Sequence, residues 1–117
     1  MKKYCINDTD TIKEVISIFE GNNDRAVVVI NKTKKVIGII SEGDIIRALS
    51  DNVDLYTPIK TILHSSFLYL NDRNMEKAYT YFKTKYISLL PIVNRNFEFL
   101  DVITINDIYN YLEDKYK

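Results

Sequence analysis

The chain has 117 residues, with 46% hydrophobic and 27% charged side chains, a balance typical of one globular domain. Sixteen basic residues balance sixteen acidic ones, so the formal net charge is zero, which argues against a general nucleic-acid binder. No apolar run approaches the ~20 residues of a membrane span, and the first residues turn polar too early for a signal peptide. We therefore expect a cytoplasmic domain without a nucleic-acid partner or a membrane span.

Residues that carry catalytic or metal chemistry are scarce. Cys5 is the only cysteine and His64 the only histidine, so an internal disulfide is excluded and a Cys/His zinc site nearly so. The two residues are conceivable as a nucleophile and its base, but neither lies in a catalytic motif, and a buried thiol is the simpler interpretation of Cys5. The sequence contains no Gly-rich phosphate loop, so we expect that the chain is not an enzyme.

The first half of the chain predicts five elements in order. An extended piece at 4–6 precedes an amphipathic helix whose apolar stripe runs from Ile12 to Phe19. Thr11 and Glu14 fit a capping box at its start, and Gly21 suits its end. Two continuously apolar strands follow at 26–30 and 36–40, joined by a polar turn, and then a helix at 42–50. Because these strands do not alternate with polar residues, we expect both of their faces to be covered.

The second half repeats this order. Residues 51–65 form a linker, in which 57–60 predict a short helical turn with Pro58 at an early position. An extended piece at 67–69, a helix with a stripe from Met75 to Phe82, strands at 88–93 and 97–103, and a helix at 105–115 follow. Pro91 removes one hydrogen-bond donor from its strand, which indicates an edge or a strand end.

A shift of 63 positions places the sequence on itself without a gap, and identical residues include Asn31 with Asn94 and Asp44 with Asp107. The chain is therefore predicted to be a tandem β-α-β-β-α repeat of the α+β (α/β) class. Each half is too small to hide its own sheet and helices. We expect the halves to pack about a pseudo-twofold axis and to leave two related clefts where they meet.

A hydroxyl and a carboxylate recur where the last strand of each half becomes a helix: Ser41 with Asp44, and Thr104 with Asp107. The unpaired amides and the dipole of a helix N-terminus favour an anion, and a carboxylate one turn later can accept hydrogen bonds from a ribose. The same spacing also fits a helix capping box, which is the more common meaning of either motif alone. Recurrence beside a cleft favours a nucleotide site, and the two roles are compatible.

These motifs lie in VVVINKTKKVIGIISEGDIIRAL at residues 27–49 and LLPIVNRNFEFLDVITINDIYNYL at residues 89–112. The chain resembles a tandem pair of CBS domains, the module named after cystathionine β-synthase, over nearly its whole length. The resemblance implies one repeat at 1–50, a linker at 51–65 and a second repeat at 66–117, together one globular module. The stretch SEGDIIRALSDNVDLYTPIKTIL is also similar to CBS pairs fused to sugar nucleotidyltransferases of bacterial surface-glycan pathways.

The resemblance implies a regulatory module that binds an adenine nucleotide (AMP, ADP, ATP or S-adenosylmethionine) in the clefts, as in energy sensing. No catalytic cofactor is implied, and the alternative is a structural dimerisation module with empty clefts. By resemblance, Ser41 and Asp44 would serve one cleft and Thr104 and Asp107 the other. The remaining residues implied are Cys5, Ile6 and Val27, and Leu68, Tyr69 and Leu90, beside the adenine; Arg25 beside a phosphate; and Gly38 before the motif.

The two halves differ at positions that bear on phosphate binding. The family's basic residue is present as Arg25 in the first half, but Ser88 replaces it in the second, and Asp101 stands where the first half has Gly38. A carboxylate near a phosphate would repel it. We therefore expect the Ser41/Asp44 cleft to bind a phosphate better, and the other cleft to be empty or to accept only a nucleoside-like group.

The surface of the chain gives expectations about partners. Tyr81 and Tyr111 lie off the apolar stripes of their helices, which indicates a partner surface, and the resemblance implies a homodimer formed through helices. The Lys32, Lys34 and Lys35 cluster is interpreted as a solvated hairpin tip. A sensor of this size is expected to act on an effector enzyme or transporter, in the same polypeptide or in a partner.

Overall fold

The computed structural model describes residues 4–64 and 66–116. The first repeat contains β1 (Cys5–Asn7), α1 (Ile12–Glu20), β2 (Ala26–Ile30), β3 (Val36–Ser41) and α2 (Glu42–Ser50). A short 3₁₀ helix, η2 (Ile59–Thr61), lies in the connection. The second repeat contains α3 (Met75–Lys85), β4 (Leu89–Val93), β5 (Phe99–Thr104) and α4 (Ile105–Lys115). The predicted helices and hairpins are thus confirmed, most of them within two residues at each end.

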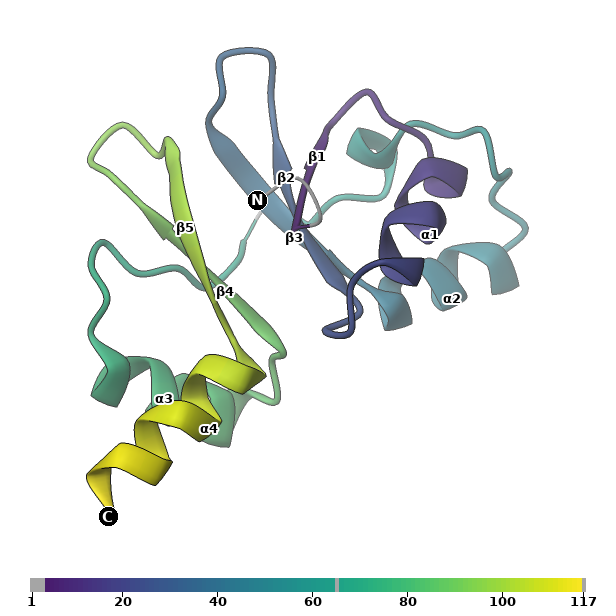
Figure 1. Ribbon diagram of the computed structural model, residues 1–117. Coiled ribbons are helices and arrows are strands. Elements are labelled where there is room, and N and C mark those ends of the chain that lie inside the picture. Colours follow the sequence, from purple (N-terminus) through teal and green to yellow (C-terminus); the bar gives the residue numbers. More distant parts are fainter. Residues whose placement is uncertain (1–3, 65, 117) are drawn as a thin grey trace.

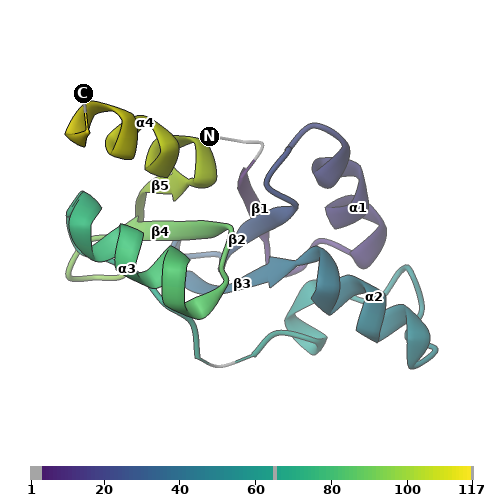
Figure 2. The same ribbon diagram turned by 90° about the horizontal axis from the view of Figure 1, so that it is seen from below.

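The two sheets face each other in the middle of the molecule, and each repeat places its helices on the outside (Figures 1 and 2). In the first sheet, β1 pairs with β2 in parallel and β2 pairs with β3 antiparallel; in the second, β4 pairs with β5 antiparallel. The two repeats also join at their hairpins, where the Val36 amide donates to the Phe97 carbonyl at 2.7 Å. The expected α+β (α/β) fold of two halves packed against each other is confirmed.

Three apolar cores explain why the strands are continuously hydrophobic. In β2, Val27 and Val29 face the helices of their own repeat, while Ala26 and Val28 face the other sheet. Because successive side chains of a strand point to opposite faces, a strand between two layers must be apolar at every position. The same alternation divides β4, and the core between the sheets consists of Ala26, Val28, Val36, Leu89, Val93 and Val102.

The opening strand of the second repeat is shorter than predicted. The first repeat pairs β1 with β2 over three residues, but the second has one parallel bridge, Leu70 with Ile92. The Leu70 amide donates to the Pro91 carbonyl, so the proline nitrogen faces the same edge. Because that nitrogen carries no hydrogen, it cannot donate to the carbonyl of the opening segment. The expected strand at 67–69 is therefore reduced to this bridge.

The connection between the repeats packs against the first repeat. Ile59 is fully buried in its core, and the amides of Ile12 and Lys13 at the start of α1 donate to the Thr57 and Leu55 carbonyls. Leu63 lies against Gly38, and a Cβ added to Gly38 would be 2.6 Å from the Cδ1 atom of Leu63. This packing carries the end of the connection to the edge of the cleft formed by Ser41 and Asp44.

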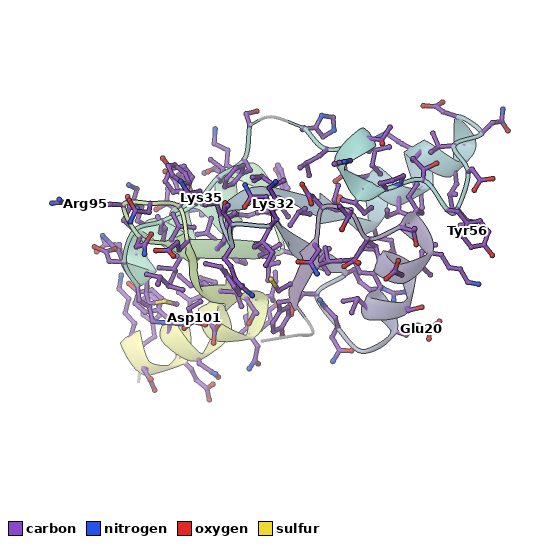
Figure 3. All side chains as sticks on the ribbon, turned by 90° about the horizontal axis from the view of Figure 1, so that it is seen from above. Glu20, Lys32, Lys35, Tyr56, Arg95 and Asp101 are labelled. Carbon is purple, nitrogen blue, oxygen red and sulfur yellow. The ribbon has the colours of Figure 1, made fainter. Side chains whose placement is uncertain are left out.

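The surface expectations have different outcomes. Lys32, Lys34 and Lys35 are exposed at the turn of the first hairpin, where Figure 3 labels Lys32 and Lys35. Tyr81 and Tyr111 are half-buried, and Tyr81 packs against the core of the second repeat, so these two tyrosines are not the exposed partner surface that the helical stripes indicated. Within residues 4–64 and 66–116, every helix is too short or too polar to reach across a lipid bilayer.

Candidate functional site

Two recesses lie where the repeats meet, and each takes residues from both. The first cleft, about 340 Å³, combines the β3–α2 junction with residues of the second repeat. The second cleft, about 520 Å³, combines the β5–α4 junction with residues of the first repeat. The first is lined by Ala26, Ile39, Ser41, Asp44, His64, Ser66, Phe67, Leu68, Tyr86, Ile87, Ser88 and Leu89. The second is lined by Tyr4, Gly21, Asn23, Asp24, Arg73, Asp101, Val102, Thr104, Asn106 and Asp107.

Ser41 and Asp44 form a helix cap at the edge of the first cleft. The Ser41 amide and Oγ each donate to Asp44 Oδ2 at 2.9 Å, and the Asp44 amide donates back to Ser41 Oγ at 3.3 Å. The other oxygen, Oδ1, lies 2.6 Å from Arg47 Nη2 and 3.9 Å from His64 Nε2. The cap therefore occupies one carboxylate oxygen, and the neighbours of the other within residues 4–64 and 66–116 are the exposed side chains of Arg47 and His64, which a ligand can displace.

Thr104 and Asp107 repeat this arrangement at the second cleft. The Thr104 amide and Oγ1 donate to Asp107 Oδ2 at 2.9 and 3.2 Å, and the Asp107 amide donates to Thr104 Oγ1 at 3.3 Å. Arg73 enters from the loop before α3: its Nη2 donates to Asp101 Oδ2 at 2.6 Å, and its Nη1 lies 4.0 Å from Asp107 Oδ2. Both motifs are thus helix caps, and both also face a recess.

The two clefts differ in polarity. Apolar side chains form most of the wall of the first cleft, which suits the flat surface of a base. The second cleft presents three carboxylates, Asp24, Asp101 and Asp107, against the one guanidinium of Arg73. An anionic ligand therefore meets a more repulsive field in the second cleft.

The pKa values of Asp101 and Tyr4 indicate the charges present in the second cleft. Burial raises the pKa of Asp101, but hydrogen bonds from Arg73 and the Val102 amide outweigh it, so the net pKa is below the ordinary value. Burial and a hydrogen bond with Asp24 raise the pKa of Tyr4. At neutral pH the cleft therefore holds an ionised Asp101 and a neutral Tyr4 phenol.

Comparison with known proteins now identifies the architecture. The family model of the CBS domain matches residues 1–51. Among solved structures, a putative acetoin utilization protein from Vibrio cholerae has a TM-score of 0.82 at 21% identity, covering 97% of this chain and 84% of that one. A CBS domain protein from Pyrobaculum aerophilum, complexed with AMP, has a TM-score of 0.76 at 26% identity, covering 95% and 91%. The chain has the fold of a CBS domain pair.

Other relatives extend this comparison. A CBS domain pair in complex with 5′-methylthioadenosine and S-adenosyl-L-methionine has a TM-score of 0.78 at 21% identity, covering 96% of this chain and 89% of that one. In sequence, the chain is 28% identical over 102 residues to a 33.4 kDa protein of Thermofilum pendens, of which it spans 33%. It is 27% identical over 114 residues to a 17.7 kDa protein of Acidianus ambivalens, covering 97% of this chain and 69% of that protein.

In this fold, each cleft combines the hydroxyl–acid motif of one repeat with the residues before the hairpin of the other. Ser88 therefore lines the Ser41/Asp44 cleft, while Asn23 and Asp24 line the Thr104/Asp107 cleft. Arg25 lines neither: its Nε lies 3.0 Å from Glu42 Oε2. This corrects the expectation that Arg25 supplies a positive charge to the Ser41/Asp44 cleft.

The other predicted residues divide between cleft and core. Leu68 lines the first cleft, and its contact with a base stays a prediction. Tyr69 lies outside both clefts, where its ring contacts Phe67 and Phe97. Gly38 packs against Leu63 and lines neither cleft, and Cys5 in β1 is half-buried, with a pKa raised by burial. The side chains of Ile6, Val27 and Leu90 are buried in the cores of their own repeats and line neither cleft, so an adenine contact at these positions stays a prediction.

Several cleft residues escape reasoning from the sequence alone. Arg73 lies in a polar loop and matches no motif, yet it is the cation of the second cleft. His64 lies in the connection, and Tyr86 follows the last residue of α3; both line the first cleft. The shift of 63 positions contains one usable signal, because it pairs Tyr86, Ile87 and Ser88 with the residues 23–25 that precede the other hairpin.

Proposed function

We propose that this chain is a regulatory module that binds an adenine nucleotide in the first cleft and changes the activity of another domain or protein. The observation that carries the proposal is the position of Ser41 and Asp44 at the edge of a mostly apolar recess formed by both repeats. The CBS pairs of similar fold that are complexed with AMP, or with 5′-methylthioadenosine and S-adenosyl-L-methionine, support this ligand class. In this proposal residues 1–50 and 66–117 are the two repeats, and 51–65 connects them.

The chemistry of the first cleft matches the parts of such a ligand. Leu68, Ile87 and Ile39 offer apolar contact to a base. Asp44 Oδ1 can accept hydrogen bonds from ribose hydroxyls once Arg47 moves aside. The N-terminus of α2 and the Ser41 hydroxyl favour a phosphate, Arg47 is a cation within reach, and the His64 imidazole lies beside it as a further polar group. The proposed role is binding, with no catalytic step and no cofactor beyond the regulatory nucleotide.

Regulation follows from the composition of the cleft. A ligand that contacts Asp44 in the first repeat and Ile87 in the second touches two bodies joined by one core. It shifts their relative packing if it prefers one arrangement, with coupling of about 1–3 kcal/mol. We propose that an effector enzyme or transporter, in the same polypeptide or in a cytoplasmic partner, responds to this shift.

We also propose that the second cleft disfavours phosphate. Asp24, Asp101 and Asp107 exceed the charge of Arg73, and Arg73 is already hydrogen-bonded to Asp101. This cleft would accept a nucleoside-like group or remain empty. The expected asymmetry is thus kept, but its physical basis is now the carboxylates of the second cleft and not Arg25.

A homodimer is part of the proposal. Ile46 and Leu49 on α2 are 57% and 38% exposed, and Tyr109 on α4 is 64% exposed. Apolar side chains on an outer helix face favour a partner surface. Light scattering at high protein concentration should give the mass of a dimer, and a monomeric mass would contradict this part. An association with sugar nucleotidyltransferases is retained as one candidate effector class; the relatives named above do not include such an enzyme.

A thermal-shift screen with AMP, ADP, ATP, GTP and S-adenosylmethionine tests the function. A ligand that binds only the folded state raises the melting temperature, by the equivalent of about 2.7 kcal/mol at one hundred times its Kd. A shift with an adenine ligand, and a smaller one with GTP, is expected. If none of the five ligands changes the melting temperature, the alternative of a structural dimerisation module with empty clefts is preferred.

A further inference from the structure

Tyr86 occupies an unfavourable backbone conformation at the rim of the first cleft. It follows the last residue of α3 with φ 55° and ψ 37°, in the left-handed region. Glycine or asparagine adopts this conformation readily, whereas a large side chain does so with strain. A tyrosine at this helix end is therefore disfavoured by the local backbone.

Contacts of the Tyr86 ring with residues 4–64 and 66–116 do not offset this strain. The residue is 92% exposed, more than Tyr116 at 76% or Tyr56 at 67%. Among the described residues, no ring pair and no cation–ring contact includes Tyr86. Packing against the part of the chain that the structure describes thus gives no reason for an aromatic side chain at this position.

Tyr86 does, however, border the recess beside Ile87 and Ser88. Phe67, Leu68 and the strands form apolar walls, while the cleft stays open on the side of solvent. A planar base on such a wall has one face covered and the other exposed. An aromatic ring attached at the rim can cover the exposed face by stacking.

We propose that Tyr86 stacks on the base of the ligand in the first cleft, as an aromatic cover that determines preference for a purine-sized base. This inference rests on the proposed nucleotide function. The second cleft has Asn23 at the equivalent position, so the same cover is absent there and stacking adds to the asymmetry between the clefts. In this proposal, the backbone strain at Tyr86 is offset when the ring stacks on the bound base.

Tyr86→Asn tests the inference, because it removes the ring while suiting the left-handed backbone. Without ligand, its melting temperature should rise by roughly 2–4 °C. Its affinity for AMP, measured by isothermal titration, should fall by about tenfold, the usual scale of one base–aromatic stack. Tyr86→Phe should keep the affinity of the wild-type chain, since stacking needs the ring and not the hydroxyl.

Lys34→Asn is the matched control, because Lys34 is also left-handed, with φ 67°, and lies at a hairpin turn that lines neither cleft. It should raise the melting temperature similarly and leave AMP affinity unchanged. If the wild-type chain binds AMP and Tyr86→Asn binds it equally well, the stacking role is overturned while the nucleotide function stands. If titration of the wild-type chain with AMP, ADP, ATP and S-adenosylmethionine gives no heat, the proposed function fails and the inference with it.

Discussion

The Arg73 guanidinium and the Asp101 carboxylate meet at the second cleft, with Nη2 2.6 Å from Oδ2, although the residues are 28 positions apart. Asp101 occupies the position that Gly38 has in the first repeat, and Arg73 also lies 3.2 Å from the Val102 carbonyl. Among the described residues, Arg73 is the only cation that lines this cleft, and its guanidinium is already hydrogen-bonded to Asp101. The charges of Asp101 and Arg73 therefore determine whether the second cleft can bind an anionic ligand.

Asp101→Asn should weaken this repulsion and free Arg73 for a phosphate. We expect AMP to bind the second cleft of the variant more tightly, by roughly threefold to tenfold, measured by titration in an Asp44→Ala background that disables the first cleft. Glu113→Gln removes one negative charge from an exposed position outside both clefts and serves as the control. Equal gains from both variants would assign the effect to net charge alone.

The same pair predicts a pH dependence of stability. The pKa of Asp101 is raised by burial but lowered further by Arg73, so its folded value lies below its unfolded value. A group of this kind contributes stability above its unfolded pKa of about 3.9, and the contribution is lost as pH falls through the folded pKa. Between pH 5 and 2, the melting temperature of Asp101→Asn should fall less than that of the wild-type chain. A parallel decline of both proteins would show that Asp101 contributes nothing.

Asp44→Ala and Asp107→Ala separate the two clefts. Both remove a capping box and should cost roughly 0.5–1 kcal/mol of stability. Only Asp44→Ala should abolish most AMP affinity, by about tenfold to one hundredfold, because it removes the acceptor proposed for the ribose. Titration calorimetry measures both, and equal losses from the two changes would contradict the asymmetry.

Glu14 provides the control for these two substitutions. It forms the same capping box with Thr11 at the start of α1, where its Oε1 accepts from the Thr11 amide at 3.1 Å, and it lines neither cleft. Glu14→Ala should lose similar stability and keep AMP affinity. If Glu14→Ala also weakened AMP binding, the effect of Asp44→Ala would belong to helix stability and not to ligand contact.

Gly38 is expected to tolerate no side chain while Leu63 stays in place. An added Cβ would lie 2.6 Å from Leu63 Cδ1 and 2.9 Å from its Cγ, so Gly38→Ala should cost about 1–3 kcal/mol in urea unfolding. Combining it with Leu63→Ala should recover part of that loss, as a favourable coupling between the two changes. Gly21→Ala is the control, since its Cβ would meet only the Ile18 carbonyl at 3.8 Å. Equal costs for Gly38→Ala and Gly21→Ala would contradict the contact with Leu63.

Asn22 should be essential for the loop that carries Asp24 to the second cleft. It is 2% exposed; its Nδ2 donates to the Ala26 carbonyl at 2.8 Å, and its Oδ1 accepts from the Asp24 and Arg25 amides. Asn22→Ala removes these three side-chain hydrogen bonds from a buried position and should cost about 2–4 kcal/mol in urea unfolding. Asn31→Ala removes comparable bonds at an exposed hairpin turn and should cost less than about 1 kcal/mol. Similar costs for the two would refute a special role for burial.

Local signals in the sequence were sufficient for the helices and hairpins. The stripe from Ile12 to Phe19, the capping boxes at Thr11, Ser41 and Thr104, and the shift of 63 positions predict the elements and their order. These signals lie within about four residues of one another or recur along the chain, so they can be recognised before the packing of the chain is known. The reduction of the opening strand of the second repeat to one bridge follows from Pro91, whose missing amide hydrogen matters only once the partner of its strand is known.

The composition of each cleft depends on contacts between residues far apart in the chain. Only the packing of the two repeats determines these contacts. Sequence reasoning placed Ser41, Asp44, Thr104 and Asp107 at the helix starts, but it assigned Arg25 to a cleft that it does not line. The clefts instead join each motif to the opposite repeat, which brings Ser88 to the first and Asp24 to the second. The two repeats pack through the whole face that each sheet presents to the other, so no local pattern of residues specifies which side chains meet in a cleft.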